Sequence, residues 1–258
     1  MSSHRLGLRV AAAVLATLVL PARMAAANEP QIPKSELPGL GPRDPRQIAD
    51  NDALPWSALG RVQTELGGRC TGTLIGPRTV LTAAHCLVAP RSGRLVQPSS
   101  VHFLLGYRHG SWKAQARAVA VTAGPGFDAR TRSPASADWA LLTLDDAIGT
   151  AGGSLLLLRD IAARQTPLML GGYQQDRPEV LMADTDCHAL GLMQRDRHPM
   201  LVHNCAGTRG ASGAPLLARG PDGAWAVAGI AVAVARSQPL GIAVPAVVVS
   251  QEREARGK

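Results

Sequence analysis

The chain has 258 residues, which allows one large domain or two small ones, and 46% of its residues are hydrophobic, enough for a sizeable core. Aromatic residues make up only 3% of the sequence, so aliphatic side chains must fill the interior. The formal net charge is +8, but the arginines are scattered and no basic block alternates with aromatic residues, so we expect no nucleic-acid partner.

The first residues have the pattern of a secretory signal. Arg5 and Arg9 precede an apolar stretch at 10–20 that is too short to span a bilayer as a mature helix. Three alanines at 25–27 fit the small-residue rule for cleavage. We therefore expect residues 1–27 to be a signal peptide and the protein to be secreted or periplasmic, with no stable membrane anchor; an uncleaved anchor is the alternative.

Residues 28–54 are rich in proline and charged residues and show neither a helical nor a strand period. Such composition predicts an extended or disordered segment. It is interpreted as either a propeptide or a plain N-terminal arm, and the sequence does not separate the two.

From Trp56 onward, short apolar segments alternate with glycine and proline turn signals. The pattern predicts strands at 57–64, 71–75, 80–82, 101–107, 117–122 and 139–144. Six strands suit one small closed barrel, which we assign to residues 55–147.

Residues 148–258 are expected to hold a crossover, a second barrel and a closing helix. The crossover lies within 145–164, where glycines interrupt the pattern. Further strands are predicted at 166–170, 180–183, 189–192, 201–204, 215–218, 225–234 and 241–244. Pro245 begins a helix that extends to residue 256. The predicted fold is all-β, with two six-stranded antiparallel β-barrels packed side by side and a short C-terminal helix.

Three residues with catalytic potential stand in distinctive settings, in the order His85, Asp138, Ser212. The histidine lies in the small-residue run TAAHC, the aspartate immediately precedes the apolar run WALL, and the serine lies in GASGAP. A serine hydroxyl needs a base to remove its proton, and a carboxylate can orient that base. The alternatives to the aspartate are Asp128, Asp145 and Asp146. The order differs from that of α/β-hydrolases, in which serine comes first.

The glycine-rich segment around the serine also predicts an oxyanion hole. Gly210 can adopt torsions that other residues avoid and can direct its N–H inward. The backbone N–H groups of Gly210 and Ser212 are therefore the expected donors.

In these three blocks the sequence resembles the trypsin-like (chymotrypsin-fold) serine proteases, and most closely the short bacterial secreted branch that includes the glutamyl endopeptidases. The resemblance extends over about residues 55–251. It implies a serine-type endopeptidase that forms an acyl-enzyme with peptide or protein substrates. Nothing in the sequence requires a metal or an organic cofactor, and we expect a monomer.

Four cysteines in an exported chain suggest disulfides, with three possible pairings. We favour Cys70–Cys86 and Cys187–Cys205, and the resemblance implies the first of these. Each disulfide would close a loop and stabilise the fold by about 3 kcal/mol in the chain-entropy model. A metal site is the rival interpretation; its candidate ligands are Cys187, His188, His198, His203 and Cys205. Their spacing fits no zinc pattern known to us, so we expect no metal.

The sequence departs from the family at positions that matter for activation and specificity. Many members carry an aspartate before the serine, which pairs with a freshly cut N-terminus, whereas this chain has Ala211. Ala231 stands where glutamyl endopeptidases place a pocket histidine, and residues 205–209 contain no acid. We therefore expect a small or medium apolar P1 residue. The pocket residues are expected to be Thr208, Ala231, Val232 and Val234.

One further departure keeps a second hypothesis open. The pocket strand lacks the serine that bridges to the catalytic residues in many active members. A catalytically weak or inactive homologue that binds peptides or proteins is therefore the alternative to the protease. An esterase is a third possibility, because an acyl-enzyme site also hydrolyses esters.

Overall fold

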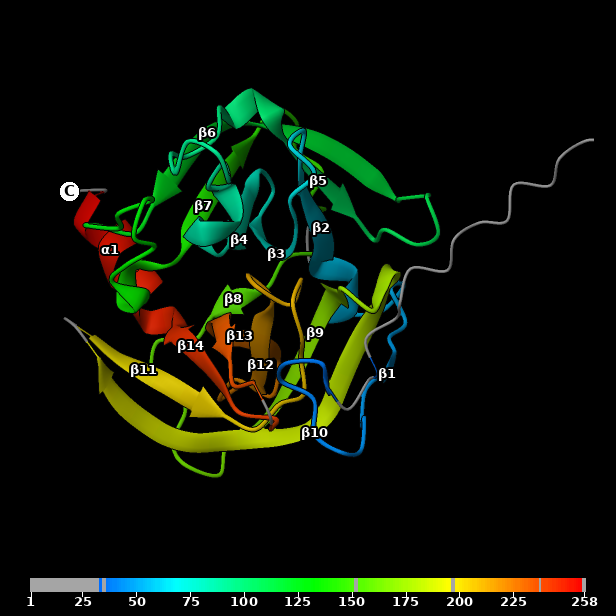
Figure 1. The fold of residues 1–258 in the computed structure, drawn as a ribbon, viewed down its shortest axis with the longest axis vertical. Coiled ribbons are helices and arrows are strands. Elements are labelled where there is room, and N and C mark those ends of the chain that lie inside the picture. Colours follow the sequence, from blue (N-terminus) through cyan, green and yellow to red (C-terminus); the bar gives the residue numbers. More distant parts are fainter. Residues whose placement is uncertain (1–32, 34–35, 151–152, 196–197, 237, 257–258) are drawn as a thin grey trace, which may run out of the picture. The chain divides into compact units, whose positions relative to one another are not determined.

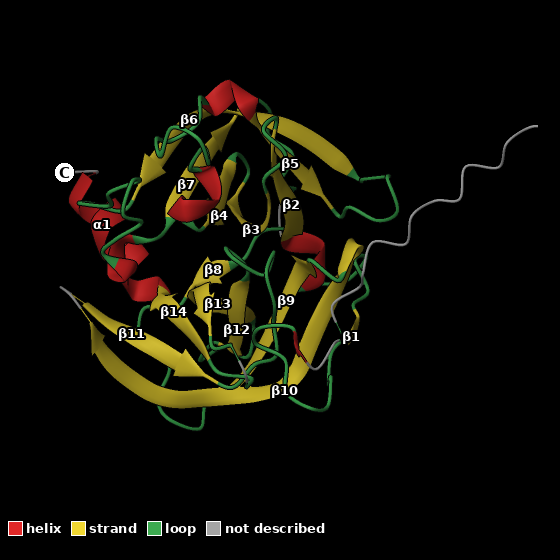
Figure 2. Ribbon diagram, viewed as in Figure 1, coloured by secondary structure: helices red, strands yellow, loops and turns green. Residues whose placement is uncertain are grey.

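The structure is a computed structural model, and it describes residues 33, 36–150, 153–195, 198–236 and 238–256 (Figure 1). The predicted signal peptide, residues 1–27, lies outside the described residues. Within the described residues, strands dominate and helices are short (Figure 2). No helix in that part of the chain is long and apolar enough to cross a bilayer.

The first barrel is closed, with strand order β2-β3-β4-β7-β6-β5 and antiparallel pairing throughout. Its strands are β2 (Leu59–Thr64), β3 (Arg69–Gly76), β4 (Thr79–Thr82), β5 (Val101–Leu105), β6 (Ala114–Ala123) and β7 (Ala140–Leu144). The six strands predicted from the sequence are confirmed, with ends that shift by up to three residues. The barrel interior holds Phe103, whose ring packs against Gly60 and Gly72, where a Cβ atom would lie 2.5 and 3.3 Å from it.

The second barrel is built from six antiparallel strands whose pairings return to their starting point, in the order β9-β10-β11-β14-β13-β12. These strands are β9 (Pro167–Gln174), β10 (Arg177–Arg195), β11 (His198–His203), β12 (Pro215–Arg219), β13 (Trp225–Val234) and β14 (Gly241–Pro245). The two-barrel prediction is therefore confirmed. Seven segments were expected here, but 180–183 and 189–192 belong to the single long strand β10. Register shifts along that strand break its alternating pattern, which explains why the sequence suggested two strands.

Shorter elements complete the fold. A strand β8 (Leu156–Leu157) pairs with β13 in parallel, and the helix α1 (Ala246–Arg256) follows β14 almost where it was predicted. Four 3-10 turns are described: Trp56–Ala58, Ala84–Leu87, Pro98–Ser100 and Ala135–Ala137.

The N-terminal arm is more ordered than its composition suggests. A strand β1 (Gln47–Ile48) pairs with β10 of the second barrel. Leu37 and Leu40 are buried against Ala206. The backbone N–H of Gly39 donates to Ala235 O at 2.8 Å. Residues 36–48 thus form part of the second barrel's packing, although no strand was expected among residues 28–54.

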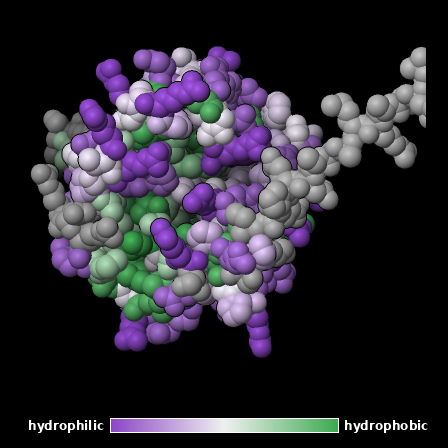
Figure 3. Space-filling model, in the orientation of Figure 1, coloured by the Kyte–Doolittle hydropathy of each residue, from purple (hydrophilic) through white to green (hydrophobic). Residues whose placement is uncertain are grey.

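The two barrels share a hydrophobic core at their seam. Leu81 and Trp139 of the first barrel belong to the same buried cluster as Leu217 and Val244 of the second. The ring of Trp56 packs on the second barrel at Gly171, where a Cβ atom would lie 2.4 Å from Cζ3. On the visible face, hydrophilic side chains cover much of the upper barrel, and hydrophobic surface gathers on the lower one (Figure 3). The seam fixes the loops of both barrels against each other, and the predicted catalytic residues lie on these loops.

Candidate active site at the seam of the two barrels

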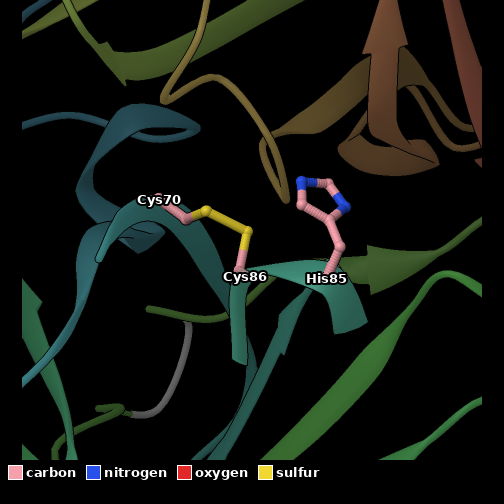
Figure 4. Close-up of side chains that lie close together, drawn as sticks. All are labelled: Cys70, His85 and Cys86. Atoms are coloured by element: carbon pink, nitrogen blue, oxygen red, sulfur yellow. A yellow bond between two sulfur atoms is a disulfide. The ribbon is translucent and has the colours of Figure 1, made fainter. Parts of the chain in front are cut away.

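His85 lies just beyond the end of β4, in the short turn Ala84–Leu87. The small residues before it are fully buried, which lets the turn pack tightly against the barrel. Cys86 follows immediately and forms a disulfide with Cys70 of β3 (Figure 4). The potential ligand atoms of His85 and the two cysteines lie within 4.8 Å of one another. Because both sulfurs are joined in a disulfide, they offer no thiolate to a metal ion.

Asp138 holds the His85 ring in one orientation. Its Oδ2 lies 2.7 Å from Nδ1 of the imidazole, and its Oδ1 accepts the His85 backbone N–H at 2.8 Å. The Asp138 side chain is 8% exposed and the His85 side chain is 18% exposed. A carboxylate only accepts hydrogen bonds, so Nδ1 carries the proton and Nε2 is left with a free lone pair. This arrangement suits a general base.

The alternatives to Asp138 occupy other places. The carboxylate of Asp128 accepts the backbone N–H of Arg130 within its own loop, and that of Asp145 accepts the backbone N–H of Arg117. Asp146 is exposed and bonds the next backbone N–H. Asp138 is thus the one of the four weighed carboxylates that meets His85.

Ser212 lies in the loop between β11 and β12, against the first barrel. Its carbonyl oxygen accepts the N–H of Thr71 at 3.0 Å. The next residue, Gly213, has a φ of +78°, and a Cβ atom there would lie 2.2 Å from Thr82 Oγ1 and 2.8 Å from Ala83 N. Glycine therefore allows this loop to contact the segment that leads into His85. Among the described residues, the Ser212 hydroxyl makes no hydrogen bond. Such contacts often tighten only with substrate.

The loop presents two backbone donors beside the serine. Gly210 has a φ of +91°, and a Cβ atom there would lie 2.2 Å from the carbonyl oxygen of Tyr173. Its own carbonyl oxygen accepts a hydrogen bond from Thr71 Oγ1 at 2.9 Å, which fixes the peptide plane. Within the described part of the chain, neither Gly210 N–H nor Ser212 N–H donates to a protein acceptor. Both are thus available to an acceptor such as a developing oxyanion.

Two of the four predicted specificity residues, Thr208 and Ala231, are bonded to this loop. Thr208 is buried, and its hydroxyl accepts a hydrogen bond from Gln175 Nε2 at 3.0 Å. Ala231 is also buried and bonds the loop through its backbone, accepting from Gly213 N at 2.8 Å. Val232 and Val234 are half-buried along β13. Thr208 and Ala231 are therefore bonded to the serine loop, whereas Val234 lies against Gly39 of the N-terminal arm, where a Cβ atom would be 2.9 Å from Val234 Cβ.

A buried charge network supports Thr208, and sequence reasoning missed it. Gln174 Oε1 accepts two hydrogen bonds, from Thr208 N at 2.8 Å and from Arg46 Nη1 at 2.6 Å. The Arg46 guanidinium also meets the carboxylates of Asp44 and Asp176, at 2.8 Å each. Burial lowers the pKa of Arg46, but the bonds to both carboxylates outweigh this and raise it. In the sequence, the only indication of this network is that Asp44 and Arg46 carry opposite charges two positions apart, in an arm that was expected to be extended.

His203 at the end of β11 has a different environment. It is fully buried against Gly241, and burial lowers its pKa to about 4, so the ring is neutral at neutral pH. Nδ1 accepts the Cys205 N–H at 3.2 Å, which places the proton on Nε2, and Nε2 is buried without a partner among the described residues. The second predicted disulfide, Cys187–Cys205, is formed, so the rival metal hypothesis loses its two thiolate ligands.

Comparisons with known proteins agree with this fold. The family model described as Trypsin matches residues 45–250. The glutamyl endopeptidase of Bacillus licheniformis is 34% identical over 62 residues, which cover 24% of this chain and 19% of that relative. The chain thus matches about a fifth of the relative's length. A solved structure described as a Glu endopeptidase in complex with MPD shares the fold, with a TM-score of 0.69 and 18% identity over 85% of this chain and 100% of that chain. Because the family model covers well over half of the sequence, the chain belongs to the trypsin-like serine protease family, as its three motif blocks indicated.

Proposed function

We propose that this protein is an exported serine endopeptidase in which Ser212 is the nucleophile, His85 the general base and Asp138 the residue that orients the base. The single observation that carries the proposal is the 2.7 Å contact between His85 Nδ1 and Asp138 Oδ2, which leaves Nε2 free to accept a proton. The serine loop is bonded to the first barrel next to this imidazole. These contacts support a nucleophile and base that face one another.

The chemistry follows from these groups. His85 Nε2 takes the Ser212 hydroxyl proton as Oγ attacks the carbonyl carbon, and the carbonyl oxygen gains negative charge between the N–H groups of Gly210 and Ser212. The C–N bond then breaks while the imidazolium gives its proton to the leaving amine. Water, activated by the same imidazole, hydrolyses the acyl-enzyme and restores the serine.

The pocket chemistry supports a small or medium apolar P1 residue. Ala231 brings no charge to the pocket wall, and the Thr208 hydroxyl is already bonded to Gln175. We expect Val232 and Val234, both half-buried on β13, to narrow the remaining space. A panel of peptides that differ only at P1 tests this assignment, and a clear preference for glutamate or arginine would refute it.

We propose that the arm from residue 36 onward stays in the mature protein. Leu37, Leu40 and Arg46 are buried in the second barrel, and removing them would expose that barrel's core. The two disulfides support export to an oxidising compartment, either the periplasm or the medium. N-terminal mass mapping of the exported protein tests both the signal cleavage and the retention of the arm.

A fluorophosphonate label tests the enzyme itself. Stoichiometric labelling that maps to Ser212 and is lost in Ser212→Ala supports the protease. No labelling of the folded protein would support the alternative, a non-catalytic homologue that binds peptides. Comparing casein with simple esters as substrates separates a protease from an esterase.

A further inference from the structure

A second pocket lies directly beside the proposed oxyanion hole. It has a volume of about 310 Å³, and its lining includes Gly210 itself. Its other walls come from both barrels and include Arg69, Arg209, Tyr173, Gln175 and Pro178. The pocket thus opens next to the scissile bond of a bound substrate, at a place that the proposed P1 pocket does not cover.

The charge of this pocket is unbalanced. Arg69 and Arg209 are both exposed, and neither has an ion-pair partner among the described residues. None of the lining residues is acidic. The acids closest in sequence to lining residues already have partners. Asp176 and Glu179 each face a buried arginine, at 2.8 and 3.5 Å, and Glu65 lies 3.4 Å from His102 Nε2 and 3.7 Å from Arg117 Nη2. Two guanidinium groups therefore line the pocket without a carboxylate to neutralise them.

Both arginines stand on anchored backbone. The carbonyl oxygen of Arg209 accepts the Gln175 N–H at 2.7 Å, and the Gln175 side chain bonds Thr208. Arg69 immediately precedes Cys70, which is disulfide-bonded to the residue after the catalytic histidine. Little backbone ordering is then required when a ligand binds, which favours affinity.

The position of the pocket assigns it to the leaving-group side of the substrate. The arginine pocket extends from Gly210 of the serine loop to Arg69, beside the disulfide that joins Cys70 to the residue after His85. His85 protonates the leaving amine in the proposed mechanism, so the residues that follow the scissile bond lie on the side of His85 and this disulfide. An extended peptide advances about 3.3 Å per residue, so the first or second residue after the scissile bond reaches the pocket.

We propose that this pocket binds an acidic side chain at P1′ or P2′ of the substrate, so that the protein prefers to cut just before acidic residues. The inference rests on the proposed protease function. A carboxylate accepts paired hydrogen bonds from a guanidinium, and amide or ammonium side chains do not match this geometry and charge. Since both arginines are exposed, screening limits the preference, and we expect about a tenfold higher kcat/KM for glutamate than for lysine.

The test uses internally quenched peptides of one sequence with glutamate, glutamine or lysine at P1′ or P2′. Glutamate should be preferred at one of these positions, and the preference should shrink in about 0.5 M salt. In Arg69→Gln/Arg209→Gln the ratio of glutamate to lysine peptides should approach one, and Arg209→Glu should favour lysine. Arg164→Gln removes an exposed arginine that does not line this pocket and is the matched control; it should retain the wild-type ratio.

The outcomes separate this inference from the function on which it rests. Cleavage of all peptides at equal rates would overturn the acidic preference and leave the protease intact. If the protein neither cleaves nor takes the fluorophosphonate label, the protease proposal fails, and a peptide-binding measurement then tests the acidic preference of the pocket. In that measurement, fluorescence polarisation with Ser212→Ala should show that the glutamate peptide binds more tightly than the lysine peptide. Equal binding of glutamate and lysine peptides would overturn the inference.

Discussion

Replacing Arg46 with methionine should destabilise the protein substantially, because the arm's arginine is a buried charge with three partners. Its side chain is fully buried, and the side chains of Asp44 and Asp176 are 20% and 12% exposed. The substitution keeps much of the volume but leaves two carboxylates facing each other across an apolar side chain. Gln174 Oε1 also loses one of its two donors.

The magnitude follows from the exposure of the remaining groups. Removing one partner of a buried ion pair typically costs about 3–5 kcal/mol, because the other charge stays buried and uncompensated. Both carboxylates here retain some access to water, so we expect a loss at the lower end, about 3 kcal/mol. For a domain of this size the midpoint of thermal unfolding should then fall by about 6–12 °C.

Urea unfolding of wild type and Arg46→Met measures the loss, with Arg43→Met as the control. Arg43 is an exposed arginine of the same arm, and its replacement should change stability by at most about 0.5 kcal/mol. Adding Asp176→Asn to Arg46→Met should recover part of the loss, since one unpaired charge is removed. The reasoning is refuted if Arg46→Met is as stable as Arg43→Met, or if the active protein begins after residue 46.

Three further predictions concern the site and its surroundings. Gly210→Ala should lower kcat by about 10²–10³-fold, because its Cβ atom would meet the Tyr173 carbonyl and displace one oxyanion donor; unchanged kcat would exclude this donor. Asp138→Asn should lower kcat by about 10⁴-fold at neutral pH by favouring the wrong His85 tautomer, which single-turnover kinetics would detect. His203 is neutral at neutral pH in the folded protein, and its pKa rises from about 4 to 6.5 on unfolding. Its contribution to stability is therefore fully present above pH 6.5 and is lost as the pH falls towards 4. The free energy of unfolding should decrease by about 3 kcal/mol over this range. Urea unfolding across this range should show a smaller acid-induced loss in His203→Gln, and an equal loss would contradict this interpretation.

The architecture was largely predictable because the alternation of apolar and polar residues along strands, and the glycine and proline residues of turns, are local signals. In the first barrel, glycine or proline residues lie near most strand ends, and all six strands were expected. The second barrel was harder, since the register shifts of β10 interrupt the alternation that identifies a strand. The arm was not predictable for a similar reason. Its strand has only two residues, Gln47 and Ile48, both exposed, and its order comes from contacts with the distant residues 182–183 and 206–207.

The candidate catalytic residues stand out in the sequence because each has a local chemical setting. Small residues before His85, an apolar strand after Asp138 and glycines around Ser212 are all visible in the sequence. The arginine pocket was not visible, because Arg69 and Arg209 are separated by 140 positions and converge only through the pairing of the two barrels. Scattered arginines gave no hint of which two would meet beside the scissile bond.

Ala211 stands where many family members carry the aspartate that pairs with a new N-terminus. In this chain, contacts from outside the serine loop replace that ion pair. An aspartate at this position would hold the loop from within, through a new N-terminus created by cleavage. Here Ala211 is buried and uncharged, and its N–H donates to Thr208 O at 3.0 Å within the loop. The loop is instead held by its neighbours: Gln174 bonds Thr208 N, and Thr71 Oγ1 bonds the Gly210 carbonyl. Because these donors and acceptors belong to strands of both barrels, we expect the proposed oxyanion hole to form on folding, without a proteolytic cut.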